Sequence, residues 1–469
     1  MAEVAAVGHP RFAVVGHPNK GKSSIVASLA WDDSVQISDT PGTTTRVRSF
    51  PLRVDGTILY ELFDTPGFQR SRRVLAWLQE HDVRADQRPE VVRDFLRVHR
   101  DDPLFADEIE LLTPIMAGAG ILYVVDGAKP YGEEYEAEME ILRWTGQPSM
   151  ALINTIGTPE YVPEWQRALG QYFKLIRQYD PMRANFDDHI ALLEAIAQLR
   201  EEWVLPVKRS IKLFEAHREE QIAQSAGVIA QLLRSSVAHV ERVSHGCREL
   251  SDADKARLTQ RYQASLRRME TEAQRRIEAI WNHTHLEKES SELLFDGMDL
   301  FSRESASIFG LSRQEMVIAG ATGGAATGAG IDLLFAGHTL LLGGLIGGVV
   351  GGVGAWWGFD ELSEIRVLGT TLGRRTLEMG PMTNRNFPWI LLGRALYHAH
   401  ILLVRSHASR GKITLKMDET FKEKWLDDTI RSGMEKYHKL LRSGKEVSDE
   451  DMGKYEVLIG KALLRLGDG

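Results

Sequence analysis

One short stretch near the N-terminus carries the strongest chemical signal in this sequence. The run GHPNKGKS fits the pattern GxxxxGK[ST] and directly follows the apolar residues 11–15. In such a loop the backbone N–H groups turn inward around a β-phosphate, Lys22 reaches the β- and γ-phosphates, and the Ser23 hydroxyl ligates Mg²⁺. Residues 24–31 have helical periodicity, so a helix N-terminus would also face the anion. We predict a phosphate-binding loop between a strand and a helix; the alternative is a chance glycine turn. The residues predicted to contact a nucleotide here are Gly16, His17, Pro18, Asn19, Lys20, Gly21, Lys22, Ser23 and Ser24.

A second motif separates a GTPase from the other enzymes that use such a loop. Asp64-Thr65-Pro66-Gly67 ends an apolar run, where the Asp64 carboxylate can hold Mg²⁺ through water and the Gly67 N–H can meet a γ-phosphate. Loss of that phosphate would release the following segment. A nucleoside kinase has no need of this motif, so the pattern favours a GTPase.

A hydroxyl-rich stretch lies between the two motifs. Residues 39–46, DTPGTTTR, predict a loop in which one threonine hydroxyl completes the Mg²⁺ shell. The alternative for each threonine taken alone is an ordinary loop hydroxyl.

Composition sets outer bounds on the function. A chain of 469 residues suggests two or three domains. Its net charge of -8 argues against a nucleic-acid partner held mainly by phosphate attraction. The single cysteine, Cys247, excludes an intrachain disulfide framework, and residues 1–6 lack the features of a signal peptide. We therefore expect a cytoplasmic protein.

Residues 10–202 alternate short apolar runs with helical stretches, which predicts an α/β domain with a mostly parallel sheet and helices on both faces. Within it we predict a helical insertion at 69–112. The remaining predicted elements are strands at 47–54, 57–63, 120–126 and 150–154, helices at 133–144 and 164–179, and a short strand at 182–185.

The rest of the chain reads as mainly helical. Residues 203–312 are charged and amphipathic and show no strand signals, which predicts a helical domain. Residues 313–359 form a glycine-rich apolar segment, and 360–469 return to mixed, mainly helical sequence with a surface helix at 419–441.

The glycine-rich segment has overlapping small-xxx-small spacings, such as Gly343 to Gly347, which let helix backbones approach closely. Residues 339–359 are long enough to cross a hydrocarbon core of roughly 30 Å, but spanning by the whole hairpin would place Asp332 in or across the membrane. We predict a helical hairpin that associates with a membrane. The alternative is a glycine-zipper hairpin buried in the helical domain or at a contact between copies of the chain.

The motifs GxPNxGKSS at 16–24, GTTTR at 42–46 and DTPG at 64–67 resemble those of the Era and TrmE group of bacterial P-loop GTPases, related to translation factors. The resemblance covers about residues 10–200. The domain order also looks similar to a family of bacterial GTPases whose C-terminal domain has no assigned function.

This resemblance implies that GTP and Mg²⁺ bind at Lys22 and Ser23. Counting from Gly42 makes Thr44 the switch threonine, whereas counting back from Arg46 makes it Thr45. In relatives, the asparagine matching Asn19 helps to hold K⁺ near the phosphates in place of an arginine finger; the alternative role is to brace the loop by hydrogen bonds.

The sequence departs from the family at the position after Gly67. Phe68 stands where many GTPases carry a glutamine that orients the attacking water, so hydrolysis should be slow without help from a cation, a partner or a nearby arginine. Candidate arginines are Arg70, Arg72 and Arg73, although arginines on a solvent-facing helix are common.

A second departure concerns the base. The guanine motif NKxD appears as Asn154-Thr155-Ile156-Gly157, and Gly157 cannot supply the carboxylate that pairs with the guanine N1 and N2 hydrogens. We expect GTP as the ligand, with relaxed or adenine specificity as the alternative. His398, His400 and His407 lack a carboxylate or cysteine cluster at ligand spacing, which favours packed or exposed histidines over a metal site.

The leading hypothesis is a nucleotide switch with slow, Mg²⁺-dependent GTPase activity, which the C-terminal region couples to a membrane or protein partner. The competing hypothesis is a non-enzymatic protein that anchors to a membrane or oligomerises, with a degenerate nucleotide domain. A homodimer is compatible with either hypothesis.

Overall fold

The computed structural model describes residues 9–18, 20–30, 46–54, 56–245, 251–281, 298–311, 365–369, 375–404 and 421–467. These fall into two compact units. The N-terminal unit comprises Met1–Arg218 with Val404–Gly411, and the C-terminal unit comprises Glu219–Leu403 with Lys412–Gly469. The predicted glycine-rich hairpin at 313–359 lies outside the described residues.

The N-terminal unit is built on a six-stranded sheet with the order β2-β3-β1-β4-β5-β6. The β2/β3 pair is antiparallel and every other neighbouring pair is parallel. The strands are β1 (Arg11–Val15), β2 (Arg48–Val54), β3 (Thr57–Asp64), β4 (Gly120–Asp126), β5 (Ser149–Asn154) and β6 (Ile176–Tyr179). The predicted fold class is confirmed.

Side chains alternate between the two faces of this sheet, and each face is covered by helices. Phe12 and Val14 of β1 pack in one buried cluster with α1 (Lys22–Ala30), α7 (Phe186–Ala197) and the start of α8 (Glu201–Val237). Ala13 and Val15 pack in a second cluster on the opposite face. The helices of that face are α2 (Ser71–Gln79), α3 (Arg88–Val98), α4 (Ala106–Met116), α5 (Glu134–Trp144) and α6 (Val162–Leu169).

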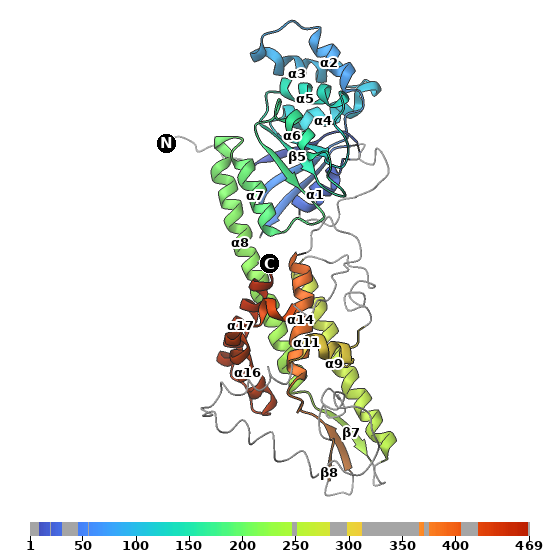
Figure 1. The fold of residues 1–469 in the computed structure, drawn as a ribbon, viewed down its shortest axis with the longest axis vertical. Coiled ribbons are helices and arrows are strands. Elements are labelled where there is room, and N and C mark those ends of the chain that lie inside the picture. The colour runs from blue at the N-terminus through green and yellow to red at the C-terminus, as the bar shows by residue number, and fades with distance from the viewer. Residues whose placement is uncertain are drawn as a thin grey trace. The chain divides into compact units, whose positions relative to one another are not determined.

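The predicted helical insertion is present between β3 and β4. It consists of α2, α3 and α4, with single turns at Ala85–Gln87 and Pro103–Phe105 between them. In Figure 1, α2 and α3 lie together beside α5. Pro89 lies in the first turn of α3, where its missing N–H has no helical partner to lose.

The prediction for residues 164–185 was wrong. The helix ends at Leu169 instead of continuing to Tyr179, and residues 176–179 form β6, paired with β5. Gly170 follows α6 directly, and a glycine weakens helix continuation. Residues 182–185 form no strand: the Asp180 carboxylate accepts the N–H of Met182 at 2.9 Å, and Asn185 caps α7 in a capping box.

The C-terminal unit is mainly helical. Its described elements are the later part of α8, α9 (Asp252–Ile280), α11 (Arg303–Phe309), α14 (Phe387–Val404), α15 (Phe421–Trp425), α16 (Asp428–Arg442), α17 (Asp449–Gly467) and the strands β7 (Glu241–His245), β8 (Ile365–Gly369) and β9 (Arg375–Met379). The predicted surface helix at 419–441 is in fact α15 and α16, separated where the Asp427 side chain caps α16.

The prediction of no strand in 203–312 was also wrong, because β7 joins an antiparallel sheet of order β7-β9-β8. The partners of β7 lie more than a hundred residues along the chain, so no local pattern announces the strand.

A buried ion pair crosses the interior of the C-terminal unit. Arg394 of α14 donates through Nε to Glu270 of α9 at 2.6 Å and through Nη1 to Ser305 at 2.8 Å, and both charged groups are buried. Among the described residues, one helix, α14, is long enough and apolar enough to cross a membrane. In the structure, however, 83% of it is buried. A core helix has the same length and composition, so this finding assigns no membrane span.

Candidate nucleotide site

The phosphate-binding loop connects β1, which ends at Val15, with α1, which begins at Lys22. The Lys22 ammonium donates to the carbonyl oxygens of Gly16 at 3.2 Å and His17 at 3.1 Å, across the loop that it closes. Burial lowers the pKa of Lys22 to about 8, although the carboxylates of Asp64 and Glu138 act in the opposite direction. A buried ammonium with only carbonyl partners is poised for an anion, because a phosphate would restore the interaction that burial removes.

Asn154, the first residue of the stretch that stands in place of the guanine motif NKxD, is hydrogen-bonded to the phosphate-binding loop. Its side chain is buried, its Nδ2 donates to the Lys20 carbonyl at 3.0 Å, and its Oδ1 accepts from the Ile156 N–H at 3.1 Å. Gly21 has a φ of 82°, and a Cβ built on it would lie 2.2 Å from Asn154 Nδ2. Only glycine fits at residue 21, which explains why the second glycine of the GxxxxGK[ST] pattern is needed here.

Ser23 and Asp64 meet at the carboxyl edge of the sheet. The Ser23 hydroxyl donates to Asp64 Oδ2 at 2.9 Å, and Asp64 is buried. A hydroxyl beside a carboxylate is an oxygen donor pair suited to Mg²⁺, which takes one or two protein groups and fills its other positions with phosphates and water. The residues present therefore fit the ion that the sequence predicted.

Replacing Ser23 with alanine should weaken nucleotide binding about tenfold in Mg²⁺, because the ion loses a ligand, and should change little in EDTA. Isothermal titration in both buffers measures this difference. Ser28→Ala is the matched control, because Ser28 lies on the same helix but its hydroxyl contacts Tyr179. Equal loss in both buffers would remove Ser23 from the ion site.

The remaining residues of DTPG pack against the loop. Thr65 is buried and donates to the Val14 carbonyl at 2.8 Å. Pro66 and Gly67 are buried as well, and a Cβ built on Gly67 would lie 2.6 Å from the Pro18 nitrogen. The structure therefore brings the two predicted phosphate motifs into direct contact.

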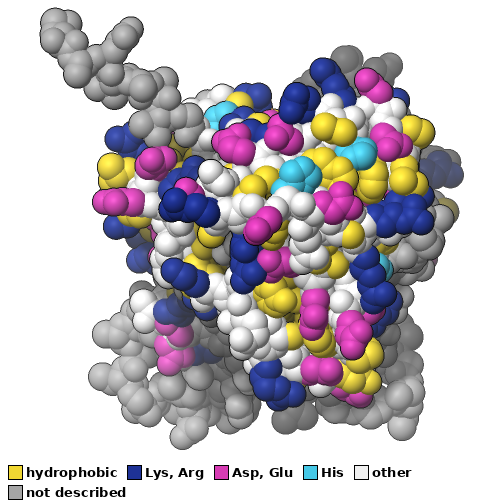
Figure 2. Space-filling model, turned by 90° about the horizontal axis from the view of Figure 1, so that it is seen from above, with side chains coloured by type: hydrophobic (Ala, Val, Ile, Leu, Met, Phe, Trp, Pro, Cys, Tyr) yellow, Lys and Arg dark blue, Asp and Glu magenta, His cyan; other side chains and the backbone are white. Residues whose placement is uncertain are grey.

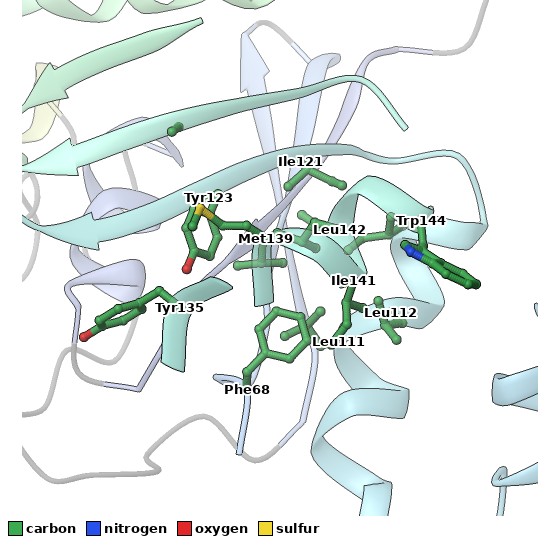
Figure 3. Close-up of a cluster of buried hydrophobic side chains, with 14 of the residues drawn as sticks. Phe68, Leu111, Leu112, Ile121, Tyr123, Tyr135, Met139, Ile141, Leu142 and Trp144 are labelled. Atoms are coloured by element: carbon green, nitrogen blue, oxygen red, sulfur yellow. The ribbon is translucent and has the colours of Figure 1, made fainter. Parts of the chain in front are cut away.

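Phe68 points into the protein interior. Its side chain is 1% exposed and lies in the buried cluster of Figure 3 with Leu111, Met139 and Ile141. An aromatic ring in that cluster cannot orient a water molecule at the phosphates. Arg72 and Arg73 are exposed on α2, and Arg70 is half-buried directly before it.

A buried carboxylate beneath the loop was not found by sequence analysis. Glu138 of α5 is 1% exposed, lies 2.8 Å from His17 Nδ1 and accepts from the Tyr123 hydroxyl at 2.8 Å. These residues are distant in the chain, and Glu138 has the spacing of an ordinary helix charge. The register of α5 over the sheet creates the contact.

Some predicted residues lie outside the described part of the chain. These are Asn19, Thr44 and Thr45, the predicted K⁺ ligand and the alternative switch threonines. The site that the structure assembles consists of Gly16, His17, Pro18, Lys20, Gly21, Lys22, Ser23, Ser24, Asp64, Thr65, Pro66, Gly67 and Asn154.

The structure also places two of the three histidines that were considered as metal ligands. His398 and His400 lie on α14, and burial lowers the pKa of each to about 4. In the described ranges, no group of three or more His, Cys, Asp or Glu residues is placed to hold a metal ion. His407 lies outside those ranges.

Two family models match the chain. Residues 166–459 match a model described as a domain of unknown function, DUF3482. The chain belongs to this DUF3482 family. Residues 11–155 of the DUF3482 protein match a second model, described as a 50S ribosome-binding GTPase. The predicted resemblance is confirmed: residues 11–155 match a P-loop GTPase domain.

Curated relatives match this DUF3482 protein over the same region. GTPase Der of Desulforudis audaxviator is 29% identical over 184 residues, which cover 35% of this chain and 41% of Der. The tRNA modification GTPase MnmE of Caulobacter vibrioides is 31% identical over 149 residues, covering 26% of this chain and 33% of MnmE. The chain thus spans about two fifths or less of these relatives.

Solved structures of Era are also similar. Era in complex with MgGDPNP and nucleotides 1506–1542 of 16S ribosomal RNA has a TM-score of 0.29 and 16% identity, covering 52% of this chain and 74% of Era. Aquifex aeolicus Era bound to GDP and aluminium fluoride has a TM-score of 0.28 and 14% identity, covering 58% and 89%.

Proposed function

We propose that this protein is a nucleotide switch that binds GTP with Mg²⁺, hydrolyses it slowly, and passes its nucleotide state to a partner through the C-terminal unit. The observation that carries the proposal is the assembly of Lys22, Ser23 and Asp64 at one edge of the sheet, with the hydroxyl 2.9 Å from the carboxylate. Lys22 holds the phosphates, and the Gly67 N–H reads the γ-phosphate.

Slow hydrolysis follows from the residue after Gly67. The buried ring of Phe68 leaves the position that orients the attacking water without a side-chain acceptor. Mg²⁺, when bound, neutralises charge between the β- and γ-phosphates. The chain's own residues bind and orient the nucleotide. Fast hydrolysis requires a further group, which is K⁺ near Asn19, an arginine, or a partner.

The test is an equilibrium titration with GTP, ATP and XTP, each with Mg²⁺ or EDTA and with K⁺ or Na⁺. We expect Mg²⁺-dependent binding that is strongest for GTP, and slow turnover that K⁺ accelerates. Absence of Mg²⁺-dependent binding for every nucleotide would overturn the switch and leave a degenerate nucleotide domain.

The coupling to a membrane or protein partner rests on the chain connection and on sequence. The helix α8 begins in the N-terminal unit and ends in the C-terminal unit, and residues 317–358 contain no Lys or Arg and a single acid. On the face drawn in Figure 2, basic and acidic side chains are interspersed. Deleting 317–358 should abolish membrane partitioning, and GTP should alter the partitioning of the wild type. Partitioning that responds to the deletion and ignores nucleotide would favour anchoring alone.

A further inference from the structure

The segment after Gly67 is held by a buried carboxylate from another helix. Glu108 of α4 is fully buried, and its Oε1 accepts the backbone N–H of Gln69 at 2.9 Å and of Arg70 at 2.6 Å. These two amides lie two and three residues beyond Gly67, the residue placed to read a γ-phosphate. Glu108 therefore fixes the chain immediately downstream of the reading position.

The Glu108 carboxylate lies at the N-terminus of α2 and accepts hydrogen bonds there. Arg70 is the N-cap of α2 and its side chain makes no capping hydrogen bond; Glu108 accepts instead the N–H of the cap residue itself and the N–H of Gln69 directly before it. A carboxylate beside a helix N-terminus is favoured by the exposed N–H groups and the helix dipole. Burial of a charge in an apolar cluster is costly without such partners, so the carboxylate and the segment stabilise one another.

The same helix holds the other segment that flanks the phosphates. Glu110 Oε2 accepts the Val47 N–H at 3.0 Å, and Val47 follows Thr44 and Thr45 in the chain within three residues. Residues two apart project from nearly opposite sides of a helix. Consequently α4 is hydrogen-bonded to Val47 through one side of the helix and to Gln69 and Arg70 through the other.

We propose that α4 couples the two segments flanking the γ-phosphate, with Glu108 and Glu110 as positioning residues that hold each segment for a triphosphate. The proposal rests on the proposed function, since it concerns the same nucleotide site. In it, the contacts of Glu108 and Glu110 order both segments before a nucleotide binds.

The consequence is selective for the γ-phosphate. Lys22 and the phosphate loop contact both GDP and a triphosphate, whereas Gly67 contacts only the third phosphate. Glu108→Ala should therefore lower the affinity for GppNHp about tenfold and leave GDP affinity within about twofold. Glu110→Ala should act in the same direction, and Glu108→Gln, which keeps an acceptor at the bonded position, should restore most of the loss.

The experiment measures GppNHp and GDP affinities of the full chain by titration, and amide exchange of residues 67–72 without nucleotide. We expect Glu108→Ala to accelerate exchange at Gln69 and Arg70 and to leave the phosphate loop unchanged. Glu140→Ala is the control, because Glu140 bonds Arg143 and Trp144 on α5 and touches neither segment.

Two results would overturn the proposal. One is an equal loss of GppNHp and GDP affinity in Glu108→Ala; the other is unchanged exchange at Gln69 and Arg70. Should Glu108→Ala fail to fold, Glu110→Ala decides by the ratio of GppNHp to GDP affinity, which should fall if the proposal holds and stay at the wild-type value if it does not. A wild type that binds neither nucleotide would sink the proposed function, and the exchange result would still decide whether Glu108 holds the segment.

Discussion

Replacing Lys22 with alanine should lower the affinity for GTP at least about 100-fold, because the loss of a buried charge-assisted contact to phosphate removes about 3 kcal/mol. The ammonium carries a positive charge into a buried position, where it faces the carbonyls of Gly16 and His17. Alanine leaves the backbone N–H groups in place, and they alone cannot neutralise a triphosphate.

The same substitution should not destabilise the protein. The depressed pKa of Lys22 shows that burial disfavours its charge in the folded state, so removing the ammonium relieves an unfavourable burial. The melting temperature of Lys22→Ala without nucleotide should equal or exceed that of the wild type, while the stabilisation by GTP should disappear. Thermal unfolding with and without GTP measures both quantities.

Lys174→Ala provides a matched control, since Lys174 is exposed and distant in sequence from both phosphate motifs. It should leave nucleotide binding and the melting temperature unchanged. If Lys22→Ala retained wild-type affinity, the loop would not be a phosphate site, and the switch hypothesis would fail at its first step.

The phosphate half of the site was predictable because its residues are close in sequence. Strand, glycine loop and helix occur within twenty residues, and their order alone fixes where Lys22 and Ser23 lie. Asp64 was predictable for a similar reason, since it ends a strand whose parallel pairing with β1 places it beside the loop. Local chemistry and strand topology together specify this edge of the sheet.

The residues that brace the site were not predictable. Glu138 under His17 and Glu108 behind Gln69 are acids on helices with no distinguishing spacing, and only the packing of α5 and α4 gives them partners. The same limit explains the missed strands: β6 was read as part of a helix, and β7 pairs with residues far along the chain. Long-range pairing leaves no local pattern.

Both the sequence and the structure leave the guanine site without the aspartate of the NKxD motif. The Asn154 side chain is held by the Lys20 carbonyl of the loop, but Gly157, three residues further along the chain, offers no carboxylate. Gly157 has a φ of 87°, and nothing lies within 4 Å of a Cβ built on it. The loop therefore has room for a side chain at the position where a guanine-specific site carries an aspartate.

Gly157→Asp should raise the affinity for GTP over ATP by about 100-fold, because a carboxylate would pair with the N1 and N2 hydrogens of guanine. Competition titrations with GTP, ATP and XTP measure the ratio.

Gly157→Asn is the matched control: asparagine and aspartate have the same shape and share the strain of a positive φ, which both tolerate better than other side chains. Asparagine offers N2 a donor where it needs an acceptor, so GTP should gain nothing, whereas the C2 carbonyl of XTP should gain a partner. If Gly157→Asp left the ratio of GTP to ATP affinity unchanged, the base edge would not face residue 157, and Asn154 would be a brace for the phosphate loop with no part in choosing the base.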